Sequence, residues 1–105
     1  MYVDLLSSAL DAWVEQLDDE ELITYTLERR TEMLQTNTQS STDVYEVIAT
    51  EITYDCALIM LCKRYDIEVD VLNFRFPREE RASIERQLAA QGADLALLSL
   101  EVDED

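Results

Sequence analysis

The chain has 105 residues, of which 24 are Asp or Glu, eight are Lys or Arg and none is His, giving a formal net charge of -16 at pH 7. The length suits one domain, and a hydrophobic content of 48% can close a modest core, which excludes a disordered acidic tail. The lack of histidine excludes Ser-His-Asp and Cys-His catalysis within one chain, and the single glycine excludes Gly-rich phosphate-binding loops.

The first half of the chain predicts two amphipathic helices. In residues 4–17 the apolar side chains recur at three- and four-residue steps, which is the pattern of one helix face: Leu6, Ala9, Leu10, Trp13, Val14 and Leu17. A second helix is expected from Asp18 to about Leu34, with Asp18 and Glu21 forming a capping box at its start. Residues 36–42 are polar and poor in helix formers, so they predict the main loop.

A third helix is expected from about Asp43 to Tyr65. Residues 56–62 are apolar on every side, so this part is either surrounded by its own bundle or half covered by another chain. Alternating apolar residues in 67–76 favour an extended linker. Pro77 suits the start of a fourth helix and Gly92 its end, with a buried side formed by Ala82, Ile84, Leu88 and Ala89.

These elements predict an all-α fold in residues 1–105. We expect a single small domain, a compact bundle of four main helices with the third helix central and a short extended linker before the last. Residues 95–102 are too apolar for a free tail and are expected to dock as a final turn or arm. The acids Glu101, Asp103, Glu104 and Asp105 are expected to remain in solvent, and 101–105 is the segment in which disorder is expected.

Three polar or reactive residues fall in the apolar part of the third helix. Cys56 and Cys62 would be roughly 9 Å apart on one helix, too far for a disulfide, so they are expected to be buried free thiols. Asp55, if buried there, requires a partner, and an arginine is the natural one.

Carboxylate chemistry is the one enzymatic alternative that the composition leaves. Glu28 with Glu32, and Glu51 with Asp55, are i,i+4 pairs that could share a magnesium ion between helices. Any acid-rich helix produces such pairs, so we expect solvated faces, no enzyme activity, no metal and no cofactor. A metal-dependent hydrolase would lose turnover on Glu51→Gln.

The acidic residues of the first two helices form stripes opposite the apolar faces. A net charge of -16 over a surface of about 6,000 Å² is about one charge per 380 Å², against about one per 110 Å² on duplex DNA. Imitation of nucleic acid therefore requires that the acids gather on one side. The predicted partner-binding residues are Asp4, Asp11, Glu15, Asp18, Glu21, Tyr25, Glu28 and Glu32.

We expect a non-enzymatic regulator or inhibitor that binds a basic surface of a partner protein. The narrower hypothesis is nucleic-acid mimicry, in which the partner is a nucleic-acid-binding protein and the chain itself binds no nucleic acid. The alternative is a structural or assembly subunit, a homodimer included, which associates through apolar surface of residues 56–62 and 95–102. In that case the acidity reflects solubility or salt adaptation.

The chain start and the apolar runs bear on location. Residues 1–4 lack the basic region of a signal peptide, and the longest apolar run has seven residues, far short of a membrane span. We therefore expect a cytoplasmic protein that does not associate with membranes.

Overall fold

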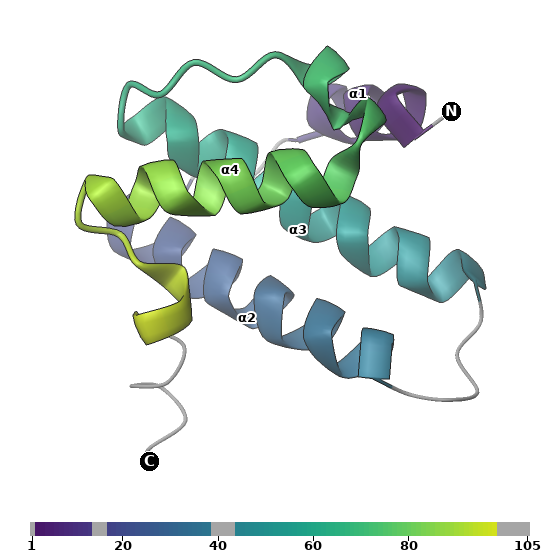
Figure 1. Ribbon diagram of the computed structural model, residues 1–105, viewed down its shortest axis with the longest axis horizontal. Coiled ribbons are helices and arrows are strands. Elements are labelled where there is room, and N and C mark those ends of the chain that lie inside the picture. The colour runs from purple at the N-terminus through teal and green to yellow at the C-terminus, as the bar shows by residue number, and fades with distance from the viewer. Residues whose placement is uncertain (1, 14–16, 39–43, 99–105) are drawn as a thin grey trace.

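The computed structural model describes residues 2–13, 17–38 and 44–98 of the chain. These residues form the helices α1 (Tyr2–Asp11), α2 (Asp19–Thr38), α3 (Val44–Arg64) and α4 (Pro77–Ala90), and a short 3-10 helix, η1 (Val71–Arg75), precedes α4 (Figure 1). The described residues include no strand. The predicted all-α class with four main helices is confirmed.

Helix α3 is the central element of the bundle. Helices α1, α2 and α4 all pack on α3, and η1 packs on α1 and α4, whereas no backbone contact joins α1 to α2 within the described residues. The middle of α3 is buried on nearly every side, with Tyr54, Ala57, Leu58 and Cys62 fully shielded from solvent. The apolar belt at 56–62 is thus enclosed by the chain's own helices, which is the first of the two arrangements that its all-round apolar pattern predicted.

The start of α2 follows the predicted capping box. The Asp18 amide donates to Glu21 Oε1 at 3.1 Å, and the Glu21 amide donates to Asp18 Oδ1 at 2.8 Å. Each side chain therefore satisfies a backbone donor that a helix N-terminus leaves open.

Two predicted boundaries were wrong. Helix α1 ends at Asp11 rather than Leu17. At this point the Trp13 amide donates to the Leu10 carbonyl, three residues back, which closes a turn instead of continuing the α-helix. Helix α2 continues to Thr38, so its last turn occupies the first part of the predicted loop. The Thr36 hydroxyl donates to the Glu32 carbonyl at 2.8 Å, so this largely buried side chain has its hydrogen-bond partner within the helix. Residues 39–43 lie outside the described part of the chain.

The linker before α4 is only partly extended. Residues 67–70 have no regular structure, as expected, but residues 71–75 coil into η1, whose first turn is capped where Asp70 Oδ1 accepts the Leu72 amide at 2.9 Å. Helix α4 has the predicted bounds, and Gly92 follows it with a φ of 98°, a left-handed conformation that favours glycine. Beyond it, Ala93 and Leu95 are buried and residues 95–98 form a helical turn, so this part of the predicted arm docks on the core, although Leu97 is exposed. Residues 99–105, which include the rest of the arm and the acidic end, lie outside the described residues.

Candidate functional site: an acidic hollow beside helix α2

The predicted partner-binding residues lie on two separate helices. Asp4 and Asp11 are exposed on α1, while Asp18, Glu21, Glu28 and Glu32 are exposed at the start of α2 or along it. Because no backbone contact joins α1 to α2 among the described residues, the two stripes do not form one continuous surface along adjacent helices. Glu15 lies outside the described residues.

Three of the predicted residues meet in one hollow. Glu21, Tyr25 and Glu28 line an open depression of about 860 Å³ between the first half of α2 and the turn that follows α4. We call this depression the acidic hollow. Its lining also includes a third carboxylate, a second aromatic ring and apolar side chains, which the sequence had not assigned to a site: Glu20, Tyr65, Leu17, Ile23, Ala93 and Leu98.

The electrostatics of the acidic hollow are one-sided. Its lining contains three glutamates and no basic residue. Arg29 lies next to it on α2, where its guanidinium is 5.2 Å from the centre of the Tyr25 ring, 3.2 Å from Glu32 and 3.9 Å from Glu28. Arg29 therefore offsets part of the charge of Glu28 and Glu32, while Glu20 and Glu21 face the hollow without an ion pair among the described residues.

The tryptophan of the chain is coupled to this site. Trp13 packs edge to face against Tyr25, with ring centroids 5.6 Å apart. The pair connects the end of α1 to α2, and Trp13, Tyr25, Ile52 and Cys56 together line a smaller hollow of about 230 Å³. A ligand that moves Tyr25 in the acidic hollow would therefore change the surroundings of Trp13.

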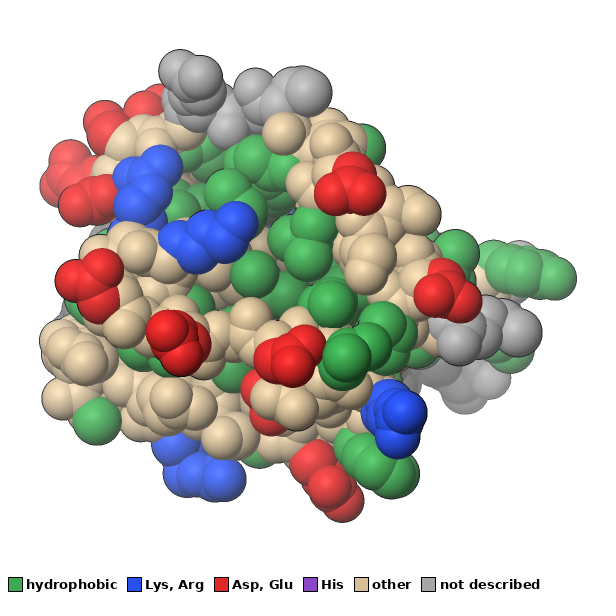
Figure 2. All heavy atoms as spheres, turned by 90° about the horizontal axis from the view of Figure 1, so that it is seen from above, with side chains coloured by type: hydrophobic (Ala, Val, Ile, Leu, Met, Phe, Trp, Pro, Cys, Tyr) green, Lys and Arg blue, Asp and Glu red, His purple; other side chains and the backbone are tan. Residues whose placement is uncertain are grey.

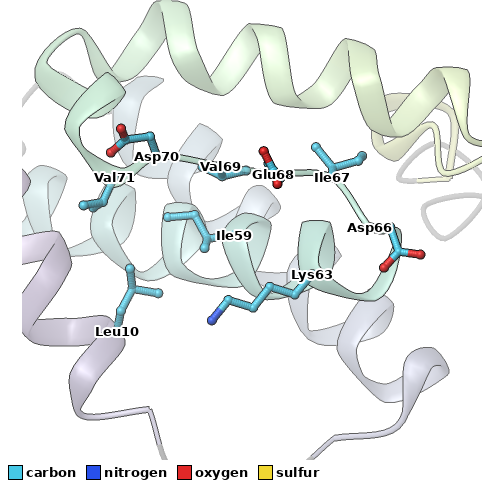
Figure 3. A pocket seen from close by; sticks show the side chains of 9 residues that line it. All are labelled: Leu10, Ile59, Lys63, Asp66, Ile67, Glu68, Val69, Asp70 and Val71. Atoms are coloured by element: carbon cyan, nitrogen blue, oxygen red, sulfur yellow. The ribbon is translucent and has the colours of Figure 1, made fainter.

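A second large hollow lies beneath segment 66–71. It has a volume of about 830 Å³, and its wall carries Lys63 and three acids between apolar side chains, as Figure 3 shows: Leu10, Ile59, Lys63, Asp66, Ile67, Glu68, Val69, Asp70 and Val71. On the face over which this segment runs, acidic side chains are spread out and basic ones lie among them (Figure 2). This hollow therefore presents charges of both signs, unlike the acidic hollow.

The interior contains an ion pair that joins three helices. Asp55 of α3 is fully buried and accepts two hydrogen bonds from Arg81 of α4, at 2.7 Å from Nε and 2.8 Å from Nη2, and a third from the Tyr2 hydroxyl of α1. The prediction that Asp55 pairs with an arginine is confirmed. Glu51 lies 3.9 Å from the same guanidinium.

The pKa values in this cluster follow from burial and pairing. Burial raises the pKa of Asp55 above its ordinary value, and the Arg81 and Tyr2 hydrogen bonds oppose that rise. Burial acts to lower the pKa of Arg81, but the hydrogen bonds and charge of Asp55 outweigh it and raise that pKa. Burial, with the negative charge of Asp55, also raises the pKa of the Tyr2 hydroxyl.

A second, partly buried set of polar residues was not predicted from the sequence. The Tyr54 hydroxyl donates to Glu85 of α4, and Arg30 of α2 approaches the same carboxylate oxygen at 3.4 Å. Arg81 and Glu85 alternate with Ile84 and Leu88 on the buried side of α4, so charged residues at core-facing spacing were the signal that could have revealed both sets.

The remaining chemical candidates are engaged in structural roles. Cys56 and Cys62 are buried free thiols, as predicted, and burial raises the pKa of each to about 11. The carboxylate pairs face arginines: Arg29 lies beside Glu28 and Glu32, and Arg81 beside Glu51 and Asp55. Within the described ranges, no three acidic or cysteine side chains gather as a metal site would require, and none of the helices is long and apolar enough to span a bilayer.

No protein-family model, curated protein or solved structure matches this chain.

Proposed function

We propose that the protein is a non-enzymatic binding module that takes a basic, amphipathic segment of a partner protein into the acidic hollow and thereby regulates or inhibits that partner. The observation that carries the proposal is a large depression lined by three glutamates, two tyrosines and apolar side chains, without a basic residue. Lysine or arginine side chains of a partner would pair with the glutamates, and its apolar side chains would pack on the rings.

The proposal is supported by the combination of side chains in the acidic hollow, not by the net charge of the protein. Glu20, Glu21 and Glu28 surround apolar surface, so a bound segment gains charge pairing and apolar burial at one place. Tyr25 and Tyr65 add ring faces on which a cationic side chain can rest. Acids spread uniformly over the surface would supply the charge pairing but neither the apolar burial nor the aromatic faces.

The test uses a synthetic helical peptide of leucine, lysine and arginine, and a second peptide of the same composition in scrambled order. Binding is followed by the fluorescence of Trp13, which contacts Tyr25. The variant Glu20→Lys with Glu28→Lys should weaken binding of the helical peptide at least tenfold. The control Glu46→Lys with Glu68→Lys has the same net charge and changes exposed residues outside the hollow, so it should weaken binding much less.

Three results would contradict the proposal. These are equal losses in the two double variants, equal binding of the scrambled peptide, and an affinity that does not change between low and physiological salt. The first two would reduce the effect to net charge, and the third would remove the role of charge pairing.

Nucleic-acid mimicry is the narrower form of the same proposal. It requires that a basic nucleic-acid-binding protein be displaced from duplex DNA or RNA by this chain, and that the Glu20→Lys, Glu28→Lys variant fail to displace it. Arg29, which lies among the carboxylates of α2, breaks the row of free negative charges that a phosphate backbone presents. The geometry accordingly favours a peptide-binding hollow over a phosphate-like ridge.

A further inference from the structure

A basic and apolar patch is exposed at the end of the molecule opposite the acidic hollow. Leu72 is 57% exposed and Phe76 is 66% exposed, and Arg75 and Arg78 in the same stretch of the chain are exposed as well. We call these four residues the 72–78 patch. Residues 71–78 contain two arginines and no acid, in a chain where acids outnumber bases three to one.

The two arginines of the patch form no ion pair with any residue that the structure describes. Arg29, Arg30, Arg64 and Arg81 each form at least one ion pair with a carboxylate. None of the ion pairs formed among the described residues involves Arg75 or Arg78. Lys63 and Arg86 also lack an ion pair among the described residues, but only Arg75 and Arg78 lie close together in the sequence and beside exposed apolar residues, so they offer two cationic groups for a contact outside the chain.

Phe76 breaks a local rule of helix structure. It is the N-cap residue of α4 and provides no side-chain hydrogen bond to the open amides of the first turn. Ser, Thr, Asp and Asn are preferred at this position because they provide that bond. An exposed phenylalanine there gives up helix stability, which is expected where a side chain serves a contact rather than the fold.

The patch and the acidic hollow lie at opposite ends of α4. The patch includes the start of the helix, and the hollow includes Gly92 and Ala93 just past its end (Figure 1). The 14 residues of α4 span about 21 Å. The patch therefore cannot enter the hollow of its own chain, but it can enter that of another copy.

We infer that copies of this chain associate head to tail, with the 72–78 patch of one copy in the acidic hollow of the next. The inference relies on the hollow as the binding site of the proposed function. Arg75 and Arg78 match the carboxylates of Glu20 and Glu28, and the exposed ring of Phe76 matches the apolar and aromatic lining. Because the two surfaces differ and lie at opposite ends of α4, the contact is heterologous and can extend into chains.

Self-association of this kind would regulate the proposed function. A hollow filled by the patch of a neighbouring copy is closed to a basic partner, so the partner and the second copy compete for one site. Copies with a net charge of -16 also repel each other, and this repulsion is screened over about 8 Å at physiological ionic strength. Association is therefore expected at high protein concentration in physiological salt rather than in dilute buffer.

The test mixes two variants that are each defective in a different surface. Arg75→Glu with Arg78→Glu removes the patch and leaves the hollow, whereas Glu20→Lys with Glu28→Lys removes the hollow and leaves the patch. In light scattering, each variant alone should stay at the monomer mass of 12.1 kDa, while the wild type should grow in mass with concentration. An equimolar mixture should form particles of twice the monomer mass and no larger, because only one intact patch and one intact hollow remain.

Two control variants distinguish loss of this contact from a general effect of net charge and from misfolding of the variant. Lys63→Glu with Arg86→Glu makes the same charge change at exposed residues without an ion pair among the described residues, and should associate as the wild type does. Phe76→Ser should fold and yet stay monomeric. A wild type that is monomeric at all concentrations, a particle that stops at a symmetric dimer, or a mixture that stays monomeric would each overturn the inference.

The same variants show whether the head-to-tail contact fails alone or together with the proposed function of the hollow. The Arg75→Glu, Arg78→Glu variant retains the hollow, so it should bind the helical basic peptide used above. If the wild type binds the peptide but does not self-associate at any concentration, the head-to-tail contact alone is overturned. Loss of both overturns the hollow as a binding site.

Discussion

Asp55 connects three helices through one carboxylate. It accepts hydrogen bonds from Tyr2 of α1 and Arg81 of α4 and is itself fully buried on α3. Removing one member of such a pair leaves the other charge buried without compensation. We expect Asp55→Asn to lower the free energy of unfolding by about 3–5 kcal/mol, measured by urea denaturation.

A double-mutant cycle tests whether the pair acts as a unit. Arg81→Met alone should also be strongly destabilising, because it leaves the Asp55 carboxylate buried. The double variant Asp55→Asn with Arg81→Met should cost clearly less than the sum of the two single changes. Additive costs would show that the two side chains contribute independently.

The buried tyrosines make stability depend on pH in the alkaline range. Burial, with the charge of Glu85, raises the pKa of Tyr54, and burial with Asp55 raises that of Tyr2. Above about pH 10 the unfolded chain loses these protons while the folded protein keeps them, so the free energy of unfolding falls as pH rises. Below that pH this contribution is fully present.

Tyr54→Phe should reduce the alkaline slope. Each such tyrosine contributes about 1.4 kcal/mol per pH unit above its unfolded pKa, so the variant should lose stability less steeply by that amount. The buried thiols, with a pKa of about 11, add to the slope from about pH 9 in both proteins. Urea denaturation at a series of pH values measures the slope of the free energy of unfolding against pH. An unchanged slope in the variant would contradict the contribution assigned to Tyr54.

At the scale of elements, helix α4 has a favourable C-terminal stop but no side-chain cap at its N-terminus. Gly92 provides a favourable stop, but Phe76 provides no cap. Phe76→Ser should therefore raise the free energy of unfolding by about 1 kcal/mol, since little buried apolar area is lost from a residue that is 66% exposed. Thermal denaturation measures this gain, and a lower melting temperature would show that Phe76 supports the fold.

The elements also show what the sequence could and could not predict. Helix α4 and the start of α2 were predictable because Pro77, Gly92 and the Asp18–Glu21 pair are local signals. The end of α1 was not, because the turn after Asp11 depends on the packing of Trp13 against Tyr25 from another helix.

Prediction of the site was also limited by its dependence on contacts between distant elements. The sequence identified Glu21, Tyr25 and Glu28 on one helix, but Tyr65 and Leu98 join them only after α3 and the C-terminal turn have folded against α2. Helical spacing places residues on a face of one element. It does not say which distant element lies beside that face, so the hollow itself could not be predicted.

At the scale of the whole molecule, the net charge of -16 gives salt opposite effects on folding and on binding. Repulsion among the acids opposes the compact state, and salt screens it, so the free energy of unfolding should rise from low to physiological ionic strength. Attraction between the acidic hollow and a basic peptide is screened by the same ions, so the peptide affinity should fall over the same range.

Both quantities can be measured on one preparation, by urea denaturation and by the fluorescence of Trp13. The Glu46→Lys, Glu68→Lys control lowers the repulsion and keeps the hollow, so its stability should respond less to salt than that of the wild type, while its peptide affinity should still fall. If the peptide affinity instead rose with salt together with the stability, charge attraction between the hollow and the peptide would not be what drives binding.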